Sequence, residues 1–260
     1  MTGIGSLSNA LGVGDARVVT FVGAGGKTTA ILRVASELQD LGLAVVVTTT
    51  TLMGGRAASH ATAEVLTEDP ESTVAQWTKR SGVTFLHAGT QRDGKYRGVS
   101  CRLIDQLIAA GAADCILVEG DGARGLPIKM PDAHEPVIPP ASDIVVPVVG
   151  LDALGRPIAP ESVHRPELFP RRCDRATVTT ETIAELLTSR TGGLKRVPEN
   201  AVARPLLNKA SLAGWDRAKG VALAVLEAAD DRDAPIDRVI TAEIHGGAFR
   251  LHRRALAERS

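Results

Sequence analysis

The stretch Arg17-Val-Val-Thr-Phe-Val-Gly-Ala-Gly-Gly-Lys-Thr-Thr29 decides the fold expected for this chain. An apolar run leads into a glycine-rich turn, which is followed by Lys-Thr and by apolar residues at helical spacing as far as Leu38. Glycines let backbone N–H groups approach an anion without Cβ clashes, and the following helix directs its positive N-terminal end at the same anion. The order strand, loop, helix therefore predicts a phosphate-binding loop.

The loop is a shortened variant of the full phosphate-loop pattern G-x-x-x-x-G-K-[ST]. Phe21 stands where the first glycine belongs, and a chance surface turn is the alternative interpretation, although the flanking strand and helix argue against it. Lys27 would reach the β- and γ-phosphates and act in catalysis, and the Thr28 hydroxyl would ligate Mg²⁺. The residues expected to bind the nucleotide phosphates are Gly23, Ala24, Gly25, Gly26, Lys27, Thr28 and Thr29.

The composition limits the classes of partner. Of the 260 residues, 44% are hydrophobic and only 3% are aromatic, so the core must be aliphatic. Lys+Arg and Asp+Glu both number 30, which leaves no basic excess for general nucleic-acid binding. The scattered Cys101, Cys115 and Cys173 fit a reducing compartment, and no secretory signal or membrane-spanning run is evident. We expect a cytoplasmic protein that binds neither nucleic acid nor membranes.

Runs rich in Val, Ile and Leu alternate with helical patterns along the chain. This alternation predicts an α/β fold with a mostly parallel sheet and helices on both faces, similar to P-loop NTPases. Residues 1–14 are expected to be an N-terminal lead-in. Residues 15–260 are expected to form a single P-loop NTPase-like domain with loop insertions.

Two segments late in the chain predict further strands. Residues 238–244 and 248–251 flank Gly246-Gly247, which is the pattern of a C-terminal β-hairpin. Residues 202–207 also predict a strand. Pro205 lies inside that strand and therefore indicates a sheet edge or a bulge.

Two carboxylates follow the apolar run that begins after Asp114. Glu119 ends the run, and Asp121 lies two residues further on between glycines. Hard oxygen ligands at the carboxyl end of a strand beside the phosphate loop are what Mg²⁺ requires. Solvated loop carboxylates are the alternative. We expect Glu119 and Asp121 to be catalytic and, together with Thr28, to bind the metal.

Other polar residues follow the remaining expected strand ends. Threonines that end the second strand could sense a γ-phosphate, hold the metal, or simply finish the strand as β-branched residues. Proline-stiffened loops after two later strands carry imidazoles, carboxylates, a lysine and an arginine, for which a solvated loop is the alternative. Because such ends share the ligand-binding edge of a sheet, they predict a second substrate or a partner. These residues are Thr49, Thr50, Lys129, His134, Glu135, Asp152, His164 and Arg165.

Asn208 and Lys209 follow a late strand and are expected to contact the nucleotide. Guanine-binding proteins carry Asn-Lys-x-Asp at this place, but Ser211 stands where the aspartate belongs. A serine cannot accept both guanine hydrogens as a carboxylate does. The expected cofactors are Mg²⁺ with ATP or GTP, with weak base discrimination or a preference for ATP.

In their order, these motifs resemble the selenium-dependent hydroxylase accessory proteins of the YqeC type. The similarity covers roughly residues 17–210. The family motif reads Glu-Ala-Asp-Gly, and in this chain Gly120 replaces the alanine of that motif. The stretches that carry the resemblance are Gly23–Thr29, Thr48–Thr51, Val118–Ala123, Lys129, His134–Pro139, Val149–Gly155, His164–Glu167 and Asn208-Lys209.

The resemblance implies a P-loop nucleotide-binding protein. It also implies a role in maturing molybdenum hydroxylases that carry labile selenium, with such a hydroxylase or its cofactor-maturation proteins as partner. The expected activity is that of an NTPase or phosphotransferase. Two alternatives stay open: a nucleotide-gated chaperone or metallochaperone with slow turnover, and a small-molecule kinase.

Overall fold

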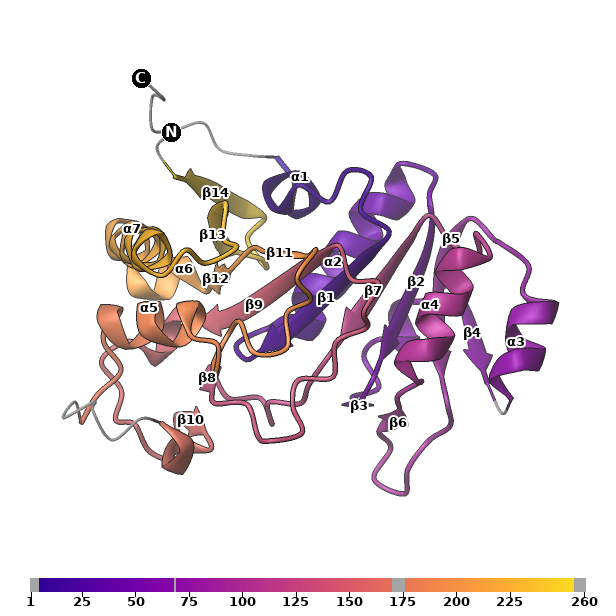
Figure 1. Cartoon of the computed structure of the whole chain (residues 1–260), viewed down its shortest axis with the longest axis horizontal. Coiled ribbons are helices and arrows are strands. Elements are labelled where there is room, and N and C mark those ends of the chain that lie inside the picture. Colours follow the sequence, from indigo (N-terminus) through magenta and orange to yellow (C-terminus); the bar gives the residue numbers. More distant parts are fainter. Residues whose placement is uncertain (1–4, 68, 170–175, 255–260) are drawn as a thin grey trace.

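A ten-stranded sheet forms the centre of the computed structural model, which describes residues 5–67, 69–169 and 176–254 (Figure 1). The strands are β1 (Val18–Gly23), β2 (Ala44–Thr49), β4 (Ala63–Leu66), β5 (Gly82–His87), β7 (Cys115–Glu119), β9 (Ile144–Gly150), β11 (Val202–Ala203), β12 (Leu206–Asn208), β13 (Arg238–Glu243) and β14 (Ala248–Arg253). Their order is β14-β13-β12-β9-β1-β7-β2-β5-β4, with β11 paired to β9.

Every strand pair in this sheet is parallel except the terminal hairpin of β13 and β14. The predicted α/β class and the C-terminal hairpin are therefore confirmed. Two small sheets lie beside the large one. They pair β3 (Leu52–Met53) with β6 (Tyr96–Arg97), and β8 (Ile128–Lys129) with β10 (Val163–His164).

Helices cover both faces of the large sheet. They are α1 (Leu7–Leu11), α2 (Lys27–Asp40), α3 (Pro70–Gln76), α4 (Cys101–Ala109), α5 (Thr180–Thr188), α6 (Ala210–Ala213) and α7 (Trp215–Asp231), with short 3₁₀ turns at Ala58–His60, Leu151–Ala153 and Pro166–Leu168. The first two helices share a core cluster with one face of the sheet. Helices α3 and α4 cover part of the other face, and α5 and α7 cover the rest (Figure 1).

Strand β1 shows why the apolar runs are continuous. Val19 and Phe21 pack in the cluster that contains Ile31 of α2, whereas Val18 packs on the opposite face in the cluster that contains Leu107 of α4. Both faces of the strand are buried, so successive residues are apolar.

The N-terminal lead-in joins the same core. Leu7 and Leu11 of α1 are fully buried beside α2. The Glu37 carboxylate accepts hydrogen bonds from the backbone N–H groups of Leu7 at 3.0 Å and Ser8 at 2.7 Å, which satisfies two otherwise unpaired donors of the first turn.

Of the two alternatives for Pro205 in residues 202–207, a sheet edge or a bulge, the sheet edge is wrong. Strand β12 lies inside the sheet between β9 and β13, and Pro205 divides the expected strand into β11 and β12. Proline has no N–H for the ladder, but its carbonyl still accepts the Ile240 N–H at 2.9 Å. The proline therefore marks an interruption in an interior strand.

Two cysteines lie in the described ranges, and both are free thiols. Burial raises the pKa of Cys115 to about 12, so this thiol stays protonated. Cys173 lies outside the described residues. Among the helices of the described part, none is long and apolar enough to cross a bilayer.

The parallel arrangement brings several strand ends to one edge of the sheet, which is the lower edge in Figure 1. Gly23, Thr49, Glu119, Gly150 and Asn208 are the last residues of β1, β2, β7, β9 and β12. The small sheets β3–β6 and β8–β10 lie at the same edge (Figure 1). Residues far apart in the sequence thus meet where ligands bind in open α/β sheets.

Candidate functional site

A glycine loop, residues 23–26, connects β1 to α2. Gly25 and Gly26 have φ values of 82° and 128°, which other residues rarely adopt. A Cβ on Gly25 would also collide with the backbone nitrogen of Gly150. The loop is therefore held closely against the end of β9, and it needs glycine at this position.

The backbone N–H groups of this segment divide into two sets. Those of Gly23, Ala24 and Gly25 donate to the Asp121 carboxylate, the Val148 carbonyl and the Leu126 carbonyl, at 2.9 to 3.1 Å. Within the described ranges, the N–H groups of residues 26–29 have no acceptor. They lie at the N-terminus of a 14-residue helix, where an anion would satisfy them.

Glu119 lies beside the start of this helix. Its Oε2 accepts a hydrogen bond from the Thr28 hydroxyl at 2.7 Å. Burial raises the pKa of Glu119, while Lys27 and the Thr28 hydroxyl oppose that shift. A dication next to this carboxylate would favour its charged form in the same way. The structure therefore brings a hydroxyl from the start of α2 together with an acid from the end of β7, and their role as metal ligands stays a prediction.

Asp121 has different neighbours. Its Oδ1 lies 3.2 Å from the Lys27 Nζ, and its Oδ2 lies 2.9 Å from the Lys129 Nζ. All three side chains are buried, with 4% exposure or less. Both oxygens also face the Gly23 N–H. The structure thus places Asp121 between two lysines, where it positions Lys27.

The series of ion pairs continues from Lys129 through Glu135 to Arg165. We call the five side chains that it connects, Lys27, Asp121, Lys129, Glu135 and Arg165, the ion chain. Lys129 Nζ lies 2.6 Å from Glu135 Oε2, and Arg165 reaches both oxygens of that carboxylate at 2.7 and 3.3 Å. Against the opposing effect of burial, the hydrogen bonds from Arg165 and Lys129 lower the pKa of Glu135 to about 2. Glu135 is therefore ionised at neutral pH.

In the late Asn-Lys pair, Asn208 contacts the glycine loop and Lys209 contacts Asp152. The Asn208 side-chain amide donates to the Gly25 carbonyl at 2.9 Å, and the Lys209 ammonium lies 2.8 Å from Asp152 Oδ2. Ser211 donates to the Glu243 carboxylate. Asn208 therefore contacts the loop directly, and a contact of either residue with a nucleotide stays a prediction.

The two predicted threonines use their hydroxyls on the backbone. Thr49 donates to the Glu119 carbonyl at 2.8 Å, and Thr50 donates to the Val137 carbonyl at 2.6 Å. These bonds tie the end of β2 to β7 and to the segment after Glu135. In this arrangement neither hydroxyl is directed at the N-terminus of α2.

A cavity of about 930 Å³ opens at this edge of the sheet. We call it the main cavity. Among the predicted site residues, its walls contain Gly25, Gly26, Lys27, Thr28, Thr29, Glu119, Glu135, His164, Arg165 and Lys209. Residues from the glycine loop and from the proline-stiffened segments therefore meet around one space.

Other predicted residues do not line the main cavity. The His134 side chain is 73% exposed, and its nearest charged partner is Asp132 at 3.9 Å. Lys129 is buried behind the wall, where it also donates to the Gly122 carbonyl. Asp152 acts on the cavity through Lys209, with which it pairs.

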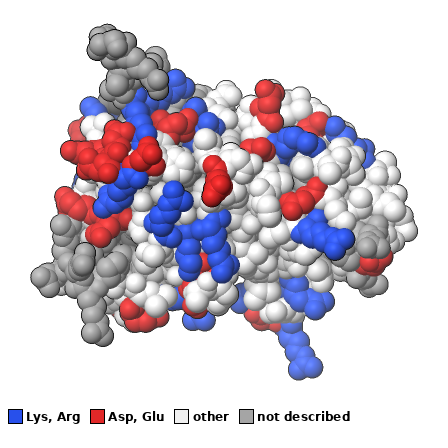
Figure 2. All heavy atoms as spheres, in the orientation of Figure 1, with Lys and Arg blue, Asp and Glu red and all other residues white. Residues whose placement is uncertain are grey.

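Three cationic residues of the main cavity are not among the site residues predicted from the sequence. They are Arg56, Lys95 and Arg124. Arg124 follows Asp121 closely in the same loop, which is a signal that could have identified it. No local pattern indicates Arg56 or Lys95. In Figure 2, Lys and Arg atoms project from the lower rim of the molecule, where Figure 1 places the loop before β6.

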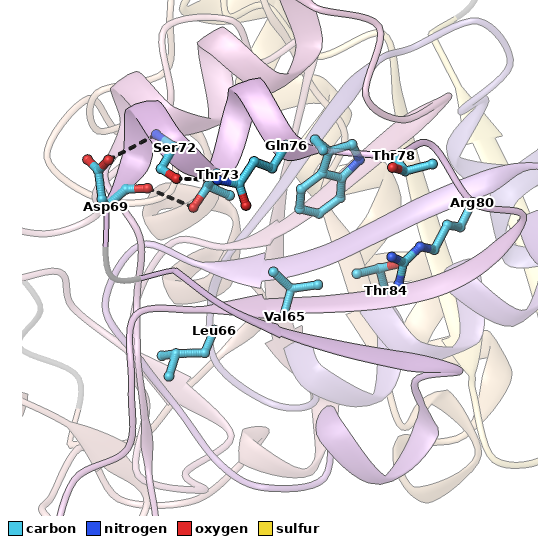
Figure 3. A pocket seen from close by; sticks show the side chains of 10 residues that line it. Val65, Leu66, Asp69, Ser72, Thr73, Gln76, Thr78, Arg80 and Thr84 are labelled. Carbon is cyan, nitrogen blue, oxygen red and sulfur yellow. Dashed lines mark hydrogen bonds between the residues drawn. The ribbon is translucent and has the colours of Figure 1, made fainter.

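A second hollow, of about 440 Å³, lies between β4 and α3 at the end of the large sheet (Figure 3). Val65, Trp77 and Thr84 line it together with Arg80. It contains none of the predicted site residues and no glycine loop. The chemistry expected from the sequence is therefore concentrated at the main cavity.

Comparison with known proteins identifies relatives of this chain. The YqeC protein family model matches residues 19–167, which is more than half of the chain. A YqeC protein from Escherichia coli (strain K12) is 36% identical over 186 residues, which are 70% of this chain and 72% of that protein. The family match includes the glycine loop, Glu119 and the whole ion chain.

Proposed function

This chain belongs to the YqeC family, and on that premise we propose that it is a Mg²⁺-dependent nucleoside triphosphate-binding protein with NTPase activity. One observation carries the proposal. The Thr28 hydroxyl contacts Glu119 at 2.7 Å, directly beside the open N-terminus of α2. A hydroxyl and a carboxylate in that position are the pair that a phosphate-bound Mg²⁺ needs.

The nucleotide phosphates would lie at the N-terminus of α2. Four consecutive N–H groups from Gly26 to Thr29 would donate to them, helped by the helix dipole. Lys27 would add a charge-assisted hydrogen bond. In the present arrangement Asp121 holds the Lys27 ammonium, so phosphate binding would partly replace that contact.

Thr28 and Glu119 would hold the Mg²⁺, which supplies neutralisation of phosphate charge when bound. Magnesium commonly uses one or two protein oxygens together with phosphates and water, and this pair satisfies that requirement. Asp121 was also expected as a ligand. Its position between two lysines favours a role in positioning Lys27 instead.

For the base, we propose weak discrimination or a preference for ATP. Asn208 and Lys209 lie beside the glycine loop, but Ser211 is a hydroxyl donor to Glu243 and provides no carboxylate for guanine. The nucleotide is therefore ATP or GTP, with ATP favoured.

The biological role that we propose is assistance in maturing selenium-dependent molybdenum hydroxylases. The family resemblance supports this role. The polar walls of the main cavity support a second bound species beside the nucleotide, either a small anionic substrate or a partner protein with a molybdenum cofactor. A nucleotide-gated chaperone with little turnover and a small-molecule kinase are the alternatives. Stimulation of slow hydrolysis by a hydroxylase apoprotein would favour the chaperone.

The Glu119→Gln substitution tests the metal site. We expect Mg²⁺-dependent hydrolysis to fall by roughly 100-fold. The amide would hold Mg²⁺ less well than the carboxylate, and the charge of the metal is worth several kcal/mol in phosphoryl transfer. Binding gives an independent readout. In calorimetry, Mg²⁺ should strengthen binding of AMP-PNP to the wild type and should have much less effect on the variant. Glu227→Gln, on the exposed face of α7, is the matched control. An identical Mg²⁺ effect in all three proteins would refute the site.

The pathway is tested in the organism. Deletion of the gene should lower purine or nicotinate hydroxylase activity and the selenium content of the purified hydroxylase. A plasmid with the wild-type gene should restore both quantities, and one with Lys27→Ala should not. Normal hydroxylase activity and normal metal and selenium content in the deletion strain would exclude this role.

A further inference from the structure

The main cavity holds more positive charge than its acidic neighbours balance. Six cationic residues line it, namely Lys27, Arg56, Lys95, Arg124, Arg165 and Lys209, against the carboxylates Glu119 and Glu135. Four of the cations have a carboxylate partner within 3.2 Å. In the described part of the chain, Arg56 and Arg124 have none.

Local backbone conformation also distinguishes this cavity. Arg124, Arg165 and Lys209 have φ values of 50°, 63° and 61°, in the left-handed region. For a residue other than glycine this conformation costs about 1 kcal/mol or more. Three long cationic side chains therefore line the main cavity from residues whose backbone conformation is unfavourable.

His164 lies on the same wall as Arg124 and Arg165. Burial lowers its pKa, and the charges of Arg165, Lys129 and Arg124 lower it further. The imidazole is consequently neutral at pH 7 and offers one donor and one acceptor. A neutral imidazole in the wall of the cavity can contact both an oxyanion and a hydroxyl of the same ligand.

The nucleotide would leave this wall free. Its phosphates would occupy the N–H groups of residues 26–29 and Lys27, whereas Arg124 comes from the segment between β7 and β8 and His164 ends β10. A volume of about 930 Å³ is near the upper end of the range for small-molecule sites, roughly 300–1,000 Å³. The cavity has room for a second ligand.

We propose that Arg56, Arg124 and His164 form a second subsite, which binds the oxyanion group of a small molecule beside the nucleotide. This subsite rests on the proposed function, and it selects the small anionic substrate over a protein partner as the second species. Arg165 donates two hydrogen bonds to Glu135, so its charge is already paired and it is not among the ligand-binding residues of the subsite.

Inorganic phosphate is the probe for the test. The full-length protein is first saturated with Mg²⁺ and AMP-PNP, which occupies the glycine loop, and is then titrated with phosphate in a calorimeter at low salt. The wild type should bind phosphate. Arg124→Asn should weaken phosphate binding by about tenfold or more, the effect of losing one charge-assisted hydrogen bond. Asparagine tolerates the left-handed conformation, so the loop should keep its shape.

The control is Arg102→Gln, which removes the same charge from the exposed side of α4. It should change phosphate affinity by no more than about twofold, since an exposed charge outside the cavity acts on the bound anion only weakly through water. AMP-PNP affinity should be equal in all three proteins. Absence of phosphate binding to the saturated wild type, or equal phosphate binding by Arg124→Asn, would overturn the subsite. Parallel loss of AMP-PNP affinity would also overturn it, because Arg124 would then belong to the nucleotide site.

The binding of Mg²⁺–AMP-PNP, measured before phosphate is added, tests the proposed function separately. If the wild type does not bind Mg²⁺–AMP-PNP, the nucleotide proposal fails. The phosphate titration is then repeated on the nucleotide-free chain. Loss of phosphate affinity in Arg124→Asn, but not in Arg102→Gln, supports the subsite there, and equal affinities refute it.

Discussion

Replacement of Lys129 by methionine is expected to lower the free energy of unfolding by about 3 kcal/mol. The Lys129 ammonium is buried and lies 2.9 Å from Asp121 and 2.6 Å from Glu135. Its removal takes one positive partner away from each of two buried carboxylates, Asp121 and Glu135. Lys27 and Arg165 still contact them, so the loss should lie near the lower end of the range for broken buried ion pairs, about 3–5 kcal/mol.

Urea unfolding followed by circular dichroism measures this effect. Lys79→Met is the matched control, because Lys79 also contacts a carboxylate, Asp114, at 2.6 Å, but its side chain is 47% exposed. An exposed pair contributes about 1 kcal/mol or less. Equal destabilisation by the two substitutions would show that the ion chain contributes no more than a surface pair.

The Lys27→Ala substitution is expected to weaken binding of Mg²⁺–ATP by about 1.5–3 kcal/mol, which corresponds to roughly 10- to 150-fold in the dissociation constant. The reason is loss of the charge-assisted hydrogen bond from Lys27 to the phosphates. Calorimetry with AMP-PNP measures the change directly. Because Lys27 also contacts Asp121, the folded fraction of the variant is checked by circular dichroism at the temperature of the titration.

Lys195→Ala provides the control for nucleotide affinity. Lys195 donates to the Asp132 carbonyl and does not line the main cavity. Its removal should leave AMP-PNP affinity within about twofold of the wild type, since a charge outside the site is screened. If Lys27→Ala binds AMP-PNP as tightly as Lys195→Ala does, the phosphates do not contact Lys27.

The sequence could predict the strand, loop and helix of the site better than the surroundings of its other polar residues. The strand, glycine loop and helix at residues 18–40 are contiguous, so their order and local preferences are legible in the chain. The place of Glu119 at the end of a strand could be predicted because Glu119 ends an apolar run, while its role as a metal ligand stays a prediction. The neighbourhoods of Asp121 and His134 could not be predicted. Asp121 lies between two lysines, and His134 is exposed to solvent.

The sequence by itself determined the glycine loop with its flanking strand and helix, the mostly parallel sheet and the terminal hairpin, because each depends on the local pattern of apolar residues and glycines. Only the tertiary structure decided that Arg56, Lys95 and Arg124 share a cavity with the loop, and that Lys129 is buried behind it. Those contacts depend on strand order and on how loops pack at the sheet edge. Strand order brings together residues that are distant in the chain, and no local periodicity records it.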